Sequence, residues 1–208
     1  MRAEEGDESP AELAEEAHAT QRRLDSALGG LHGKKIVILA TDGVERRELT
    51  EPRDAVEAAG ATTQLVSLHT GSIDLRDHDL EPAGSVTVDR LIDDVTPEDF
   101  DALLIPGGTV NADRLRNDGA AVNFVRNFVV SGKPVGSICH GPWTLIDAGV
   151  AKGRTLTSYP SLRTDLRNAG AIVVDHEVVT DGNVLTSRSP DDLPAFCSAV
   201  VETLARSG

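Results

Sequence analysis

The sequence predicts an α/β fold in which helices cover both faces of a mostly parallel sheet. From Lys34 onward, short runs rich in β-branched residues alternate with stretches of helical periodicity, which is the pattern of parallel strands joined by helical crossovers. Two of these runs, 101–108 and 133–138, are largely apolar, as in strands that are buried on both faces of a sheet. No internal repeat or low-complexity linker interrupts the 208 residues. We therefore expect one domain over 31–208.

Residues 1–30 differ from the rest and are predicted to form an acidic helical extension. They contain eight acidic and three basic residues. The segment 9–12 has the form of a capping box with proline at the first helical position, and Gly29–Gly30 would end the helix. The apolar stripe of this helix is thin, which leaves three outcomes open: docking on the main domain, an oligomer contact, or a partly frayed helix.

In the first half of the domain, apolar strands are separated by one amphipathic helix and one polar segment. The polar segment, 72–84, is predicted to be an excursion at the edge of the sheet. The other expected elements are a strand over 34–40, a helix over 48–60, a strand over 61–69, a shorter mixed strand over 85–95, a brief helical turn capped by 96–99 and a buried strand over 101–108.

The second half continues the alternation and ends in an amphipathic helix. Strand-forming runs and helical stretches again follow one another, and Gly170 and the pair Asp181–Gly182 supply breaks between them. The expected elements are a helix over 112–130, a strand over 133–138, a strand over 153–159, a helix over 161–170, two strands within 171–189 and a last helix over 191–206.

Composition and charge exclude several classes of partner. Lysine and arginine number 20 against 34 aspartate and glutamate, giving a net charge of −14 that repels nucleic-acid phosphates and anionic lipid headgroups. The first residues lack the apolar stretch of a signal peptide, and no run of about 18 apolar residues could span a bilayer. We therefore expect a soluble cytoplasmic protein with no nucleic-acid or membrane partner.

The two cysteines, Cys139 and Cys197, suggest neither a disulfide framework nor a metal site. They have no zinc-ligand spacing with the six histidines, and His176 with Glu177 forms no recognisable metal set. No metal or other cofactor is expected. Cys197 shares one helical face with apolar side chains, so it is interpreted as a packed thiol.

Cys139 lies where a strand gives way to a helix, in the segment SICHGP at 137–142. The carboxyl ends of parallel strands gather at one edge of a sheet, where binding sites form. Unpaired N–H groups and the start of the following helix would stabilise a thiolate, lowering the pKa of Cys139 from about 8.5 to roughly 3.5–7.5. Cys139 is therefore predicted to be a nucleophile. The alternative is an inert, buried thiol.

Two glycine-rich strand ends could complete the site. The backbone N–H groups of Gly107, Gly108 and His140 are candidates for holding an oxyanion formed by attack on a carbonyl. The His140 side chain is a candidate proton carrier beside the thiol. Its alternative is a capping or surface histidine.

Taken together, SICHGP, the upstream strand DALLIPGG and the downstream segment TSRSPDDLPAF resemble the PfpI family of intracellular cysteine peptidase-like proteins, within the DJ-1 superfamily of stress proteins. The resemblance runs from about Lys34 to Leu204. It implies a flavodoxin-like three-layer α/β/α sandwich, related to class I glutamine amidotransferases, with the nucleophile on a strand-to-helix turn. It also implies a homodimer or higher homo-oligomer.

The resemblance implies roles for two acids in the segment TDGVERRELTEP. Glu48, four positions before proline, matches the family's acid that hydrogen-bonds to the reactive thiol. A carboxyl held there would be protonated and would donate to the sulfur of Cys139, stabilising its charged or oxidised forms. Glu45 matches a second acid of the same loop, with an ordinary solvated charge as the alternative.

The resemblance also implies residues around His140. In the peptidase members a glutamate after the PGG loop reaches the histidine across a subunit interface, and here the aligned residue is Asp113, which is one methylene shorter. It would orient the imidazole as the third member of a triad does; alternatively, it is an ordinary acid in a helix first turn. Tyr159 matches an aromatic at the rim of the site. Arg188 matches a basic residue that could hold an anionic group.

Three functions remain open, and all belong to stress defence. In the first, Cys139 attacks reactive carbonyls or their protein adducts, as a glyoxalase- or deglycase-like hydrolase or lyase. In the second, the same residues cleave peptides, which requires Asp113 from a partner subunit. In the third, Cys139 is an oxidation sensor that stops at sulfenic or sulfinic acid, with Glu48 holding the product and no turnover.

Overall fold

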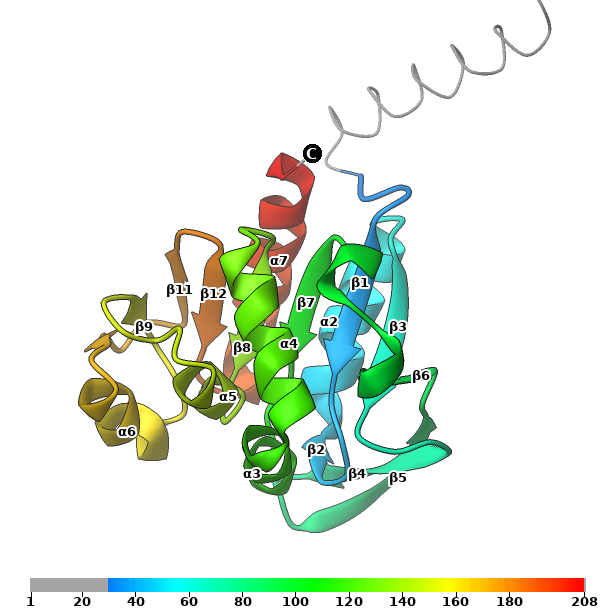
Figure 1. The fold of residues 1–208 in the computed structure, drawn as a ribbon, viewed down its shortest axis with the longest axis horizontal. Helices are drawn as coiled ribbons and strands as arrows, with labels where there is room; N and C mark the ends of the chain where they lie inside the picture. The colour runs from blue at the N-terminus through cyan, green and yellow to red at the C-terminus, as the bar shows by residue number, and fades with distance from the viewer. Residues whose placement is uncertain (1–29, 208) are drawn as a thin grey trace, which may run out of the picture.

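The computed structural model describes residues 30–207, and within them a seven-stranded sheet forms the centre (Figure 1). The extension predicted over 1–30 lies outside the described residues, apart from Gly30. The strand order is β11-β12-β8-β7-β1-β3-β6. The strands are β1 (Lys35–Leu39), β3 (Thr62–Ser67), β6 (Arg90–Leu91), β7 (Ala102–Ile105), β8 (Val135–Ile138), β11 (Val178–Asp181) and β12 (Val184–Ser187).

The sheet is parallel except at one edge. β1 pairs in parallel with both β3 and β7, and β8 pairs in parallel with β7 and β12. Only β11 runs antiparallel, because it forms a hairpin with β12 across the predicted break at Asp181–Gly182. The predicted fold class, a mostly parallel flavodoxin-like sheet between helices, is therefore confirmed.

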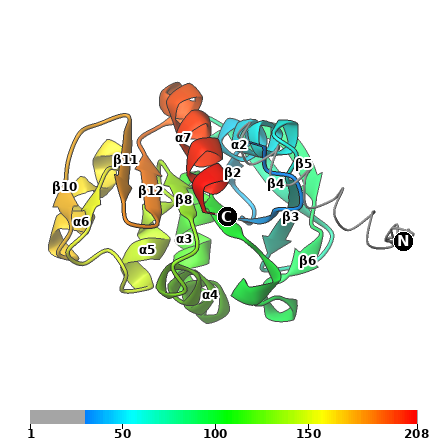
Figure 2. The same cartoon turned by 90° about the horizontal axis from the view of Figure 1, so that it is seen from above.

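Helices cover both faces of the sheet, and each covered face has its own core (Figure 2). Side chains alternate between the faces along a strand, so Val37 of β1 joins the core that contains Phe128, whereas Ile38 joins the core that contains Phe196. Full burial of each such apolar side chain contributes about 1.5–3 kcal/mol. The helices are α2 (Arg46–Ala58) and α7 (Leu193–Arg206) on one face, and α3 (Thr109–Asn117), α4 (Gly119–Val130) and α5 (Pro142–Asp147) on the other.

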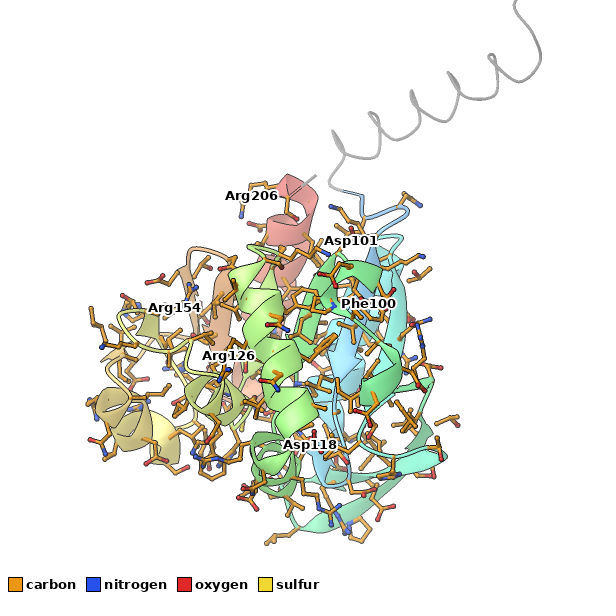
Figure 3. The ribbon with its side chains drawn as sticks, in the orientation of Figure 1. Phe100, Asp101, Asp118, Arg126, Arg154 and Arg206 are labelled. Carbon is orange, nitrogen blue, oxygen red and sulfur yellow. The ribbon has the colours of Figure 1, made fainter. Side chains whose placement is uncertain are left out.

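The single helix predicted over 112–130 is wrong, because the segment forms two helices. Asp118 separates α3 from α4: its backbone is extended, and its side chain accepts a hydrogen bond from Ala121 N–H at 2.9 Å. Figure 3 labels it at the beginning of α4. An aspartate N-cap contributes about 1 kcal/mol, and α3 begins at Thr109, directly after the PGG loop.

The polar segment 72–84, predicted to be an excursion at the edge of the sheet, forms strands of its own. It forms β4 (Ser72–Asp77) and begins β5 (Glu81–Thr87), an antiparallel pair. Together with β2 (Val44–Glu45), the pair makes a separate three-stranded sheet. Figure 1 shows it at the end of the molecule toward which β1 runs, beside α3. The strand predicted over 85–95 is accordingly divided between β5, β6 and a short 3₁₀ turn.

A second small sheet forms beside the main one. The strand predicted over 153–159 shortens to β9 (Thr155–Leu156), which pairs in parallel with β10 (Ile172–Val173) outside the main sheet. The connection between them is α6 (Arg163–Asn168). The 3₁₀ turns are η1 (Ile92–Asp94), η2 (Pro97–Asp99), η3 (Pro160–Leu162) and η4 (Pro190–Asp192). Within residues 30–207, no helix has the length and apolar character needed to cross a membrane.

Candidate active site

The predicted strand-to-helix turn lies between β8, which ends at Ile138, and α5, which begins at Pro142. Cys139 occupies the turn with a φ of +60°, a left-handed conformation that costs a non-glycine residue about 1–2 kcal/mol. Two backbone hydrogen bonds hold it: Cys139 N–H donates to Ser187 O at 3.1 Å, and Tyr159 N–H donates to Cys139 O at 3.0 Å. The turn is therefore fixed by the sheet and by the chain that follows it.

Two glycines allow the turn to pack against the neighbouring strand end. A Cβ on Gly141 would lie 2.6 Å from Ile105 O, and one on Gly107 would lie 2.7 Å from the Cβ of Cys139. Distances under about 3 Å do not occur for real Cβ atoms. The PGG and CHG motifs therefore supply close packing of backbone on backbone.

A cavity of about 160 Å³ opens on the sulfur of Cys139. It brings together five of the residues that sequence and resemblance singled out, and three that they did not. The lining residues are Glu45, Glu48, His78, Asp79, Gly108, Cys139, Tyr159 and Pro190. The Cys139 residue is only 5% exposed, so a reactant must enter this cavity to meet the thiol.

Glu48 projects from α2 into the buried side of the cavity. It is 2% exposed, and its Oε2 accepts a hydrogen bond from Gly107 N–H at 2.8 Å. Burial raises the pKa of Glu48 to about 8, against opposing contributions from Cys139 and from the Gly107 N–H. The carboxyl is therefore protonated at neutral pH. Its Oε1 is buried and has no hydrogen-bond partner among the described residues.

The expectation of an acidic thiol is wrong for the isolated chain. Burial first, and then the negative charge of an ionised Glu48, raise the pKa of Cys139 above its usual value, and the His140 N–H lowers it only in part. Removing the sulfur from water outweighs the stabilisation that nearby N–H groups provide. Because Glu48 is itself protonated below about pH 8, its charge does not oppose the thiolate at neutral pH. As a hydrogen-bond donor, the protonated carboxyl of Glu48 favours the thiolate form of Cys139 instead.

His140 lies beside the thiol and is buried with it. Its Nδ1 is 3.2 Å from Cys139 Sγ, and its ring stacks on Tyr159 with 4.7 Å between centroids. Trp143 packs against the ring at 5.4 Å. Burial lowers the pKa of His140, with a smaller opposing contribution from Asp79. The imidazole is therefore neutral at pH 7 and can accept a proton from the sulfur.

The three predicted oxyanion donors differ in availability. Gly107 N–H already donates to Glu48 Oε2, so it is not free for a substrate oxygen. The His140 N–H is directed at the Cys139 sulfur. Gly108, with a φ of +88°, lines the cavity.

Glu45 lines the cavity as well, near the turn between β4 and β5. Its Oε2 accepts a hydrogen bond from Asp79 N–H at 3.3 Å. Burial, followed by the charges of Asp77 and Asp79, raises the pKa of Glu45, against the Asp79 N–H bond. Glu45 thus belongs to the wall of the site and is not an ordinary solvated charge.

Two residues implied by the resemblance lie away from the cavity of their own chain. Arg188 is fully engaged by carboxylates: it donates to both oxygens of Asp192 at 2.8 and 2.9 Å and to Asp175 at 2.9 Å. Asp113 is exposed on α3, in a different surface depression. The role expected for Asp113 concerns a partner subunit and stays a prediction.

His78 and Asp79 were missed because the sequence gives no sign that their segment returns to the sheet edge. Both lie in the turn between β4 and β5, with φ values of +52° and +65°. Thr109, which directly follows the PGG loop, was also missed. Its position after a glycine pair at a strand end was the available signal. Among residues 30–207, no group of three His, Cys, Asp or Glu side chains is arranged to hold a metal ion.

Known proteins are similar to this chain in sequence and in fold. The model of the DJ-1/PfpI family matches residues 34–203. "Protein/nucleic acid deglycase 2" of Escherichia coli (strain K12) is 48% identical over 164 residues, which cover 78% of this chain and 93% of that protein. "General stress protein 18" of Bacillus subtilis (strain 168) is 46% identical over 165 residues, or 79% of this chain and 94% of that protein. Drosophila melanogaster DJ-1beta superposes with a TM-score of 0.75 at 28% identity, over 83% of this chain and 90% of that chain.

Proposed function

The chain belongs to the DJ-1/PfpI family, and from this premise we propose that it uses Cys139 as a nucleophile against small electrophilic carbonyls or their adducts on proteins. The observation that carries the proposal is a cavity lined by the thiol and a protonated carboxyl, with a neutral imidazole 3.2 Å from the sulfur beside it. A relative named as a deglycase supports the same class of substrate.

The size of the cavity favours a small reacting group. Its volume is about 160 Å³, and a protein cavity of about 150 Å³ holds one benzene molecule. A carbonyl compound of about five heavy atoms, or the modified end of a side chain, fits this space.

The chemistry begins with addition of the thiol to an aldehyde. The S–H proton passes to His140 Nδ1 as the sulfur bonds to the carbonyl carbon, and the imidazolium then returns that proton to the carbonyl oxygen, which leaves a hemithioacetal. Glu48, as a neutral donor, stabilises the developing charge on the sulfur or oxygen. For an α-oxoaldehyde, loss of the proton on the former aldehyde carbon and protonation of the neighbouring oxygen give an enediol. Protonation of the neighbouring carbon and loss of the hemithioacetal hydroxyl proton then give a thioester. Water hydrolyses this thioester to a hydroxy acid and regenerates the thiol.

The test compares methylglyoxal consumption by the wild-type protein and by Cys139→Ser, with Cys197→Ser as the matched control. Cys197 lies on α7 and is a second free thiol, whose pKa burial raises to about 11. We expect loss of turnover in Cys139→Ser and in His140→Ala, and wild-type turnover in Cys197→Ser. Equal consumption by the wild type and Cys139→Ser contradicts the proposal.

A second candidate is an oxidation sensor, and the neighbourhood of Glu48 favours it. A protonated carboxyl with an unpaired Oε1 could donate to a sulfinate formed on Cys139 and hold the oxidation at that stage. Mass spectrometry after mild peroxide treatment distinguishes the candidates. A sensor accumulates a stable sulfinic acid in His140→Ala as in the wild type, and it consumes no methylglyoxal.

We also propose that the protein assembles as a homodimer or larger homo-oligomer. The exposure of Asp113 on α3 leaves its carboxylate free to reach a partner subunit. Size-exclusion chromatography with light scattering tests the assembly. A strict monomer removes the role of Asp113 in trans, because it is not a lining residue of its own cavity.

A further inference from the structure

The Nε2 side of His140 has a second set of partners, which the proposed chemistry does not use. Thr109 Oγ1 lies 3.4 Å from His140 Nε2. Asp79 holds Thr109 by two hydrogen bonds: Thr109 N–H donates to Oδ1 at 2.6 Å, and the Thr109 hydroxyl donates to Oδ2 at 3.1 Å. A chain of contacts therefore runs from the turn between β4 and β5 to the imidazole and on to the thiol.

We propose that Asp79 is a positioning residue that acts through Thr109 to hold His140 in the tautomer with its proton on Nε2. The inference rests on the proposed function for its consequence in catalysis, but not for its geometry. It assigns to this chain an acid of its own for orienting the histidine, in addition to any acid from a partner subunit.

The direction of the hydrogen bonds from Asp79 through Thr109 to His140 follows from which groups have a proton to donate. A threonine hydroxyl has one proton to donate, and Asp79, as a carboxylate, can only accept. The Thr109 proton is thus committed to Asp79 Oδ2, and the hydroxyl oxygen faces His140 Nε2 with its lone pairs. Only an imidazole with its proton on Nε2 can hydrogen-bond to such an oxygen. His140 Nδ1, 3.2 Å from Cys139 Sγ, then carries the lone pair that accepts the thiol proton.

The step balances without moving a proton to Asp79. The Cys139 thiol loses its proton to Nδ1 and becomes a thiolate, and His140 becomes an imidazolium that keeps its Nε2–H on Thr109. Burial lowers the pKa of His140, and the negative charge of Asp79 opposes this lowering in part, in the direction that stabilises the imidazolium.

The turn that carries Asp79 is built to present its carboxylate here. Asp79 adopts a left-handed conformation, which non-glycine residues keep only when their surroundings hold them, and such residues cluster at functional sites. Its N–H donates to Glu45 Oε2 at 3.3 Å, and the residue lines the cavity. Ser161 offers His140 Nε2 an alternative hydroxyl at 3.3 Å. Ser161 is exposed, and no carboxylate fixes the direction of its proton among the described hydrogen bonds.

The substitution Asp79→Asn is expected to reverse the direction of the hydrogen bonds that run from this side chain through Thr109 to His140. The amide oxygen keeps the bond from Thr109 N–H, so the amide N–H₂ replaces Oδ2 and donates to the Thr109 hydroxyl. That hydroxyl must then donate to His140 Nε2, which selects the tautomer with its proton on Nδ1. In this form the ring has no lone pair for the thiol proton. A wrong tautomer in a triad of known geometry costs up to about 10⁴-fold in turnover, and we expect a fall in kcat of tenfold or more with KM unchanged.

The test reads the tautomer directly by long-range ¹H–¹⁵N correlation on ¹⁵N-histidine protein at pH 8. One of the six histidines is assigned to His140 by its loss in His140→Gln. We expect the Nε2–H form in the wild type, in Thr109→Ser and in Ser161→Ala. We expect the Nδ1–H form in Asp79→Asn and a substantial population of it in Thr109→Val, which also serves if Asp79→Asn fails to fold.

Asp54→Asn is the matched control, since it makes the same chemical change at an exposed position of α2, outside the site. A wild-type tautomer in both Asp79→Asn and Thr109→Val overturns the inference, and so does a change in Asp54→Asn without one in Asp79→Asn. The readout separates the inference from the proposed function. If the tautomers respond as expected in a protein that consumes no methylglyoxal, the proposed function is contradicted and the positioning role of Asp79 is retained.

Discussion

Two regions of the chain adopt left-handed backbone at non-glycine residues within 30–207, and they meet at one cavity. One is the turn at Cys139 between β8 and α5, and the other is the turn at His78 and Asp79 between β4 and β5. The first is held by backbone, through Ser187 O of the main sheet and the N–H of Tyr159, which follows β9. The second is held by side chains.

This difference separates the nucleophile from the groups that adjust it. The Cys139 turn lies where close packing leaves no freedom, so the position of the sulfur is set by the core of the domain. The β4–β5 hairpin is anchored by Ile73 and Leu75 in the core and by backbone pairing with β2, but its turn is attached by polar side-chain contacts, among them the ion pair of Arg46 with Asp77 at 2.9 Å. Such contacts tolerate replacement. Substitutions of the polar residues at this turn can therefore change the charge and protonation around the thiol at little cost to stability.

The largest expected effect concerns the buried acid behind the Cys139 turn. Glu48 has a pKa of about 8 in the folded chain against an ordinary value of 4.5, so between these pH values the folded state keeps a proton that the unfolded state releases. The contribution of Glu48 to stability is fully present below about pH 4.5 and is lost as the pH rises through 8. Glu48→Gln has no such loss. Relative to wild type, it should gain roughly 3–5 kcal/mol between pH 4.5 and pH 9.

Urea unfolding at the two pH values measures this gain. The control is Glu51→Gln, on the same helix, whose side chain is 40% exposed and pairs with Arg47. It should change the free energy of unfolding by less than about 1 kcal/mol at either pH. Parallel pH curves for the wild type and Glu48→Gln would show that the carboxyl is ionised in the folded protein.

The next effect tests the packing of the Cys139 turn. Gly141 has ordinary helical angles, φ −50° and ψ −37°, so alanine is acceptable to its backbone. Its Cβ, however, would lie 2.6 Å from Ile105 O and from Ser137 Oγ. Gly141→Ala should lose about 2–3 kcal/mol, as overpacked cores do, and should abolish turnover by moving the sulfur.

Gly119→Ala is the matched control for the packing test, because it begins α4 and has no atom within 4 Å of a Cβ. It should be neutral or more stable by up to about 1 kcal/mol. Thermal unfolding of both variants, with methylglyoxal consumption, makes the measurement. Equal stability of the two variants would mean that the turn is not as tightly packed as the structure has it.

The two regions also differ in how far the sequence predicts them. A cysteine between a buried strand and a proline-initiated helix indicates the Cys139 turn, and PGG indicates the strand end beside it. Residue order along the chain is enough for both, because the carboxyl ends of parallel strands meet at one edge. The resemblance adds Glu48, whose burial the sequence pattern could not indicate.

The hairpin could not be predicted in the same way. The segment 72–84 is mostly polar, and only Ile73 and Leu75 in β4 alternate as buried residues, which is too short a periodicity to mark paired strands. Its return to the site depends on β2, a strand of two residues. The sequence predicts a lowered pKa for Cys139, whereas the structure gives a raised one. N–H groups and a helix start can be recognised in the sequence, but the desolvation that outweighs them cannot.

A smaller effect is expected from detaching the hairpin. Arg46 and Asp77 make a two-point contact at 2.9 and 3.1 Å, with side chains 41% and 30% exposed. Arg46→Gln should lower the free energy of unfolding by less than about 1 kcal/mol. Hydrogen exchange should accelerate in β4 and β5 while β8 keeps its protection. Faster exchange in β8 as well would show that the hairpin and the main sheet open as one unit.

The smallest effect, that of His78→Gly, is the reference that separates backbone from side chain in the turn between β4 and β5. At His78, with φ +52°, glycine removes about 1 kcal/mol of left-handed strain but loses 0.5 to about 1 kcal/mol more entropy on folding. His78→Gly should therefore stay within about 0.5 kcal/mol of the wild type. Asp79→Gly relieves the same conformation but removes the acceptor of two Thr109 hydrogen bonds, and should be less stable than His78→Gly by about 1–2 kcal/mol. Equal free energies of unfolding in urea for the two variants would show that the backbone, and not the Asp79 side chain, holds this turn. The turn would then not differ from the Cys139 turn in this respect.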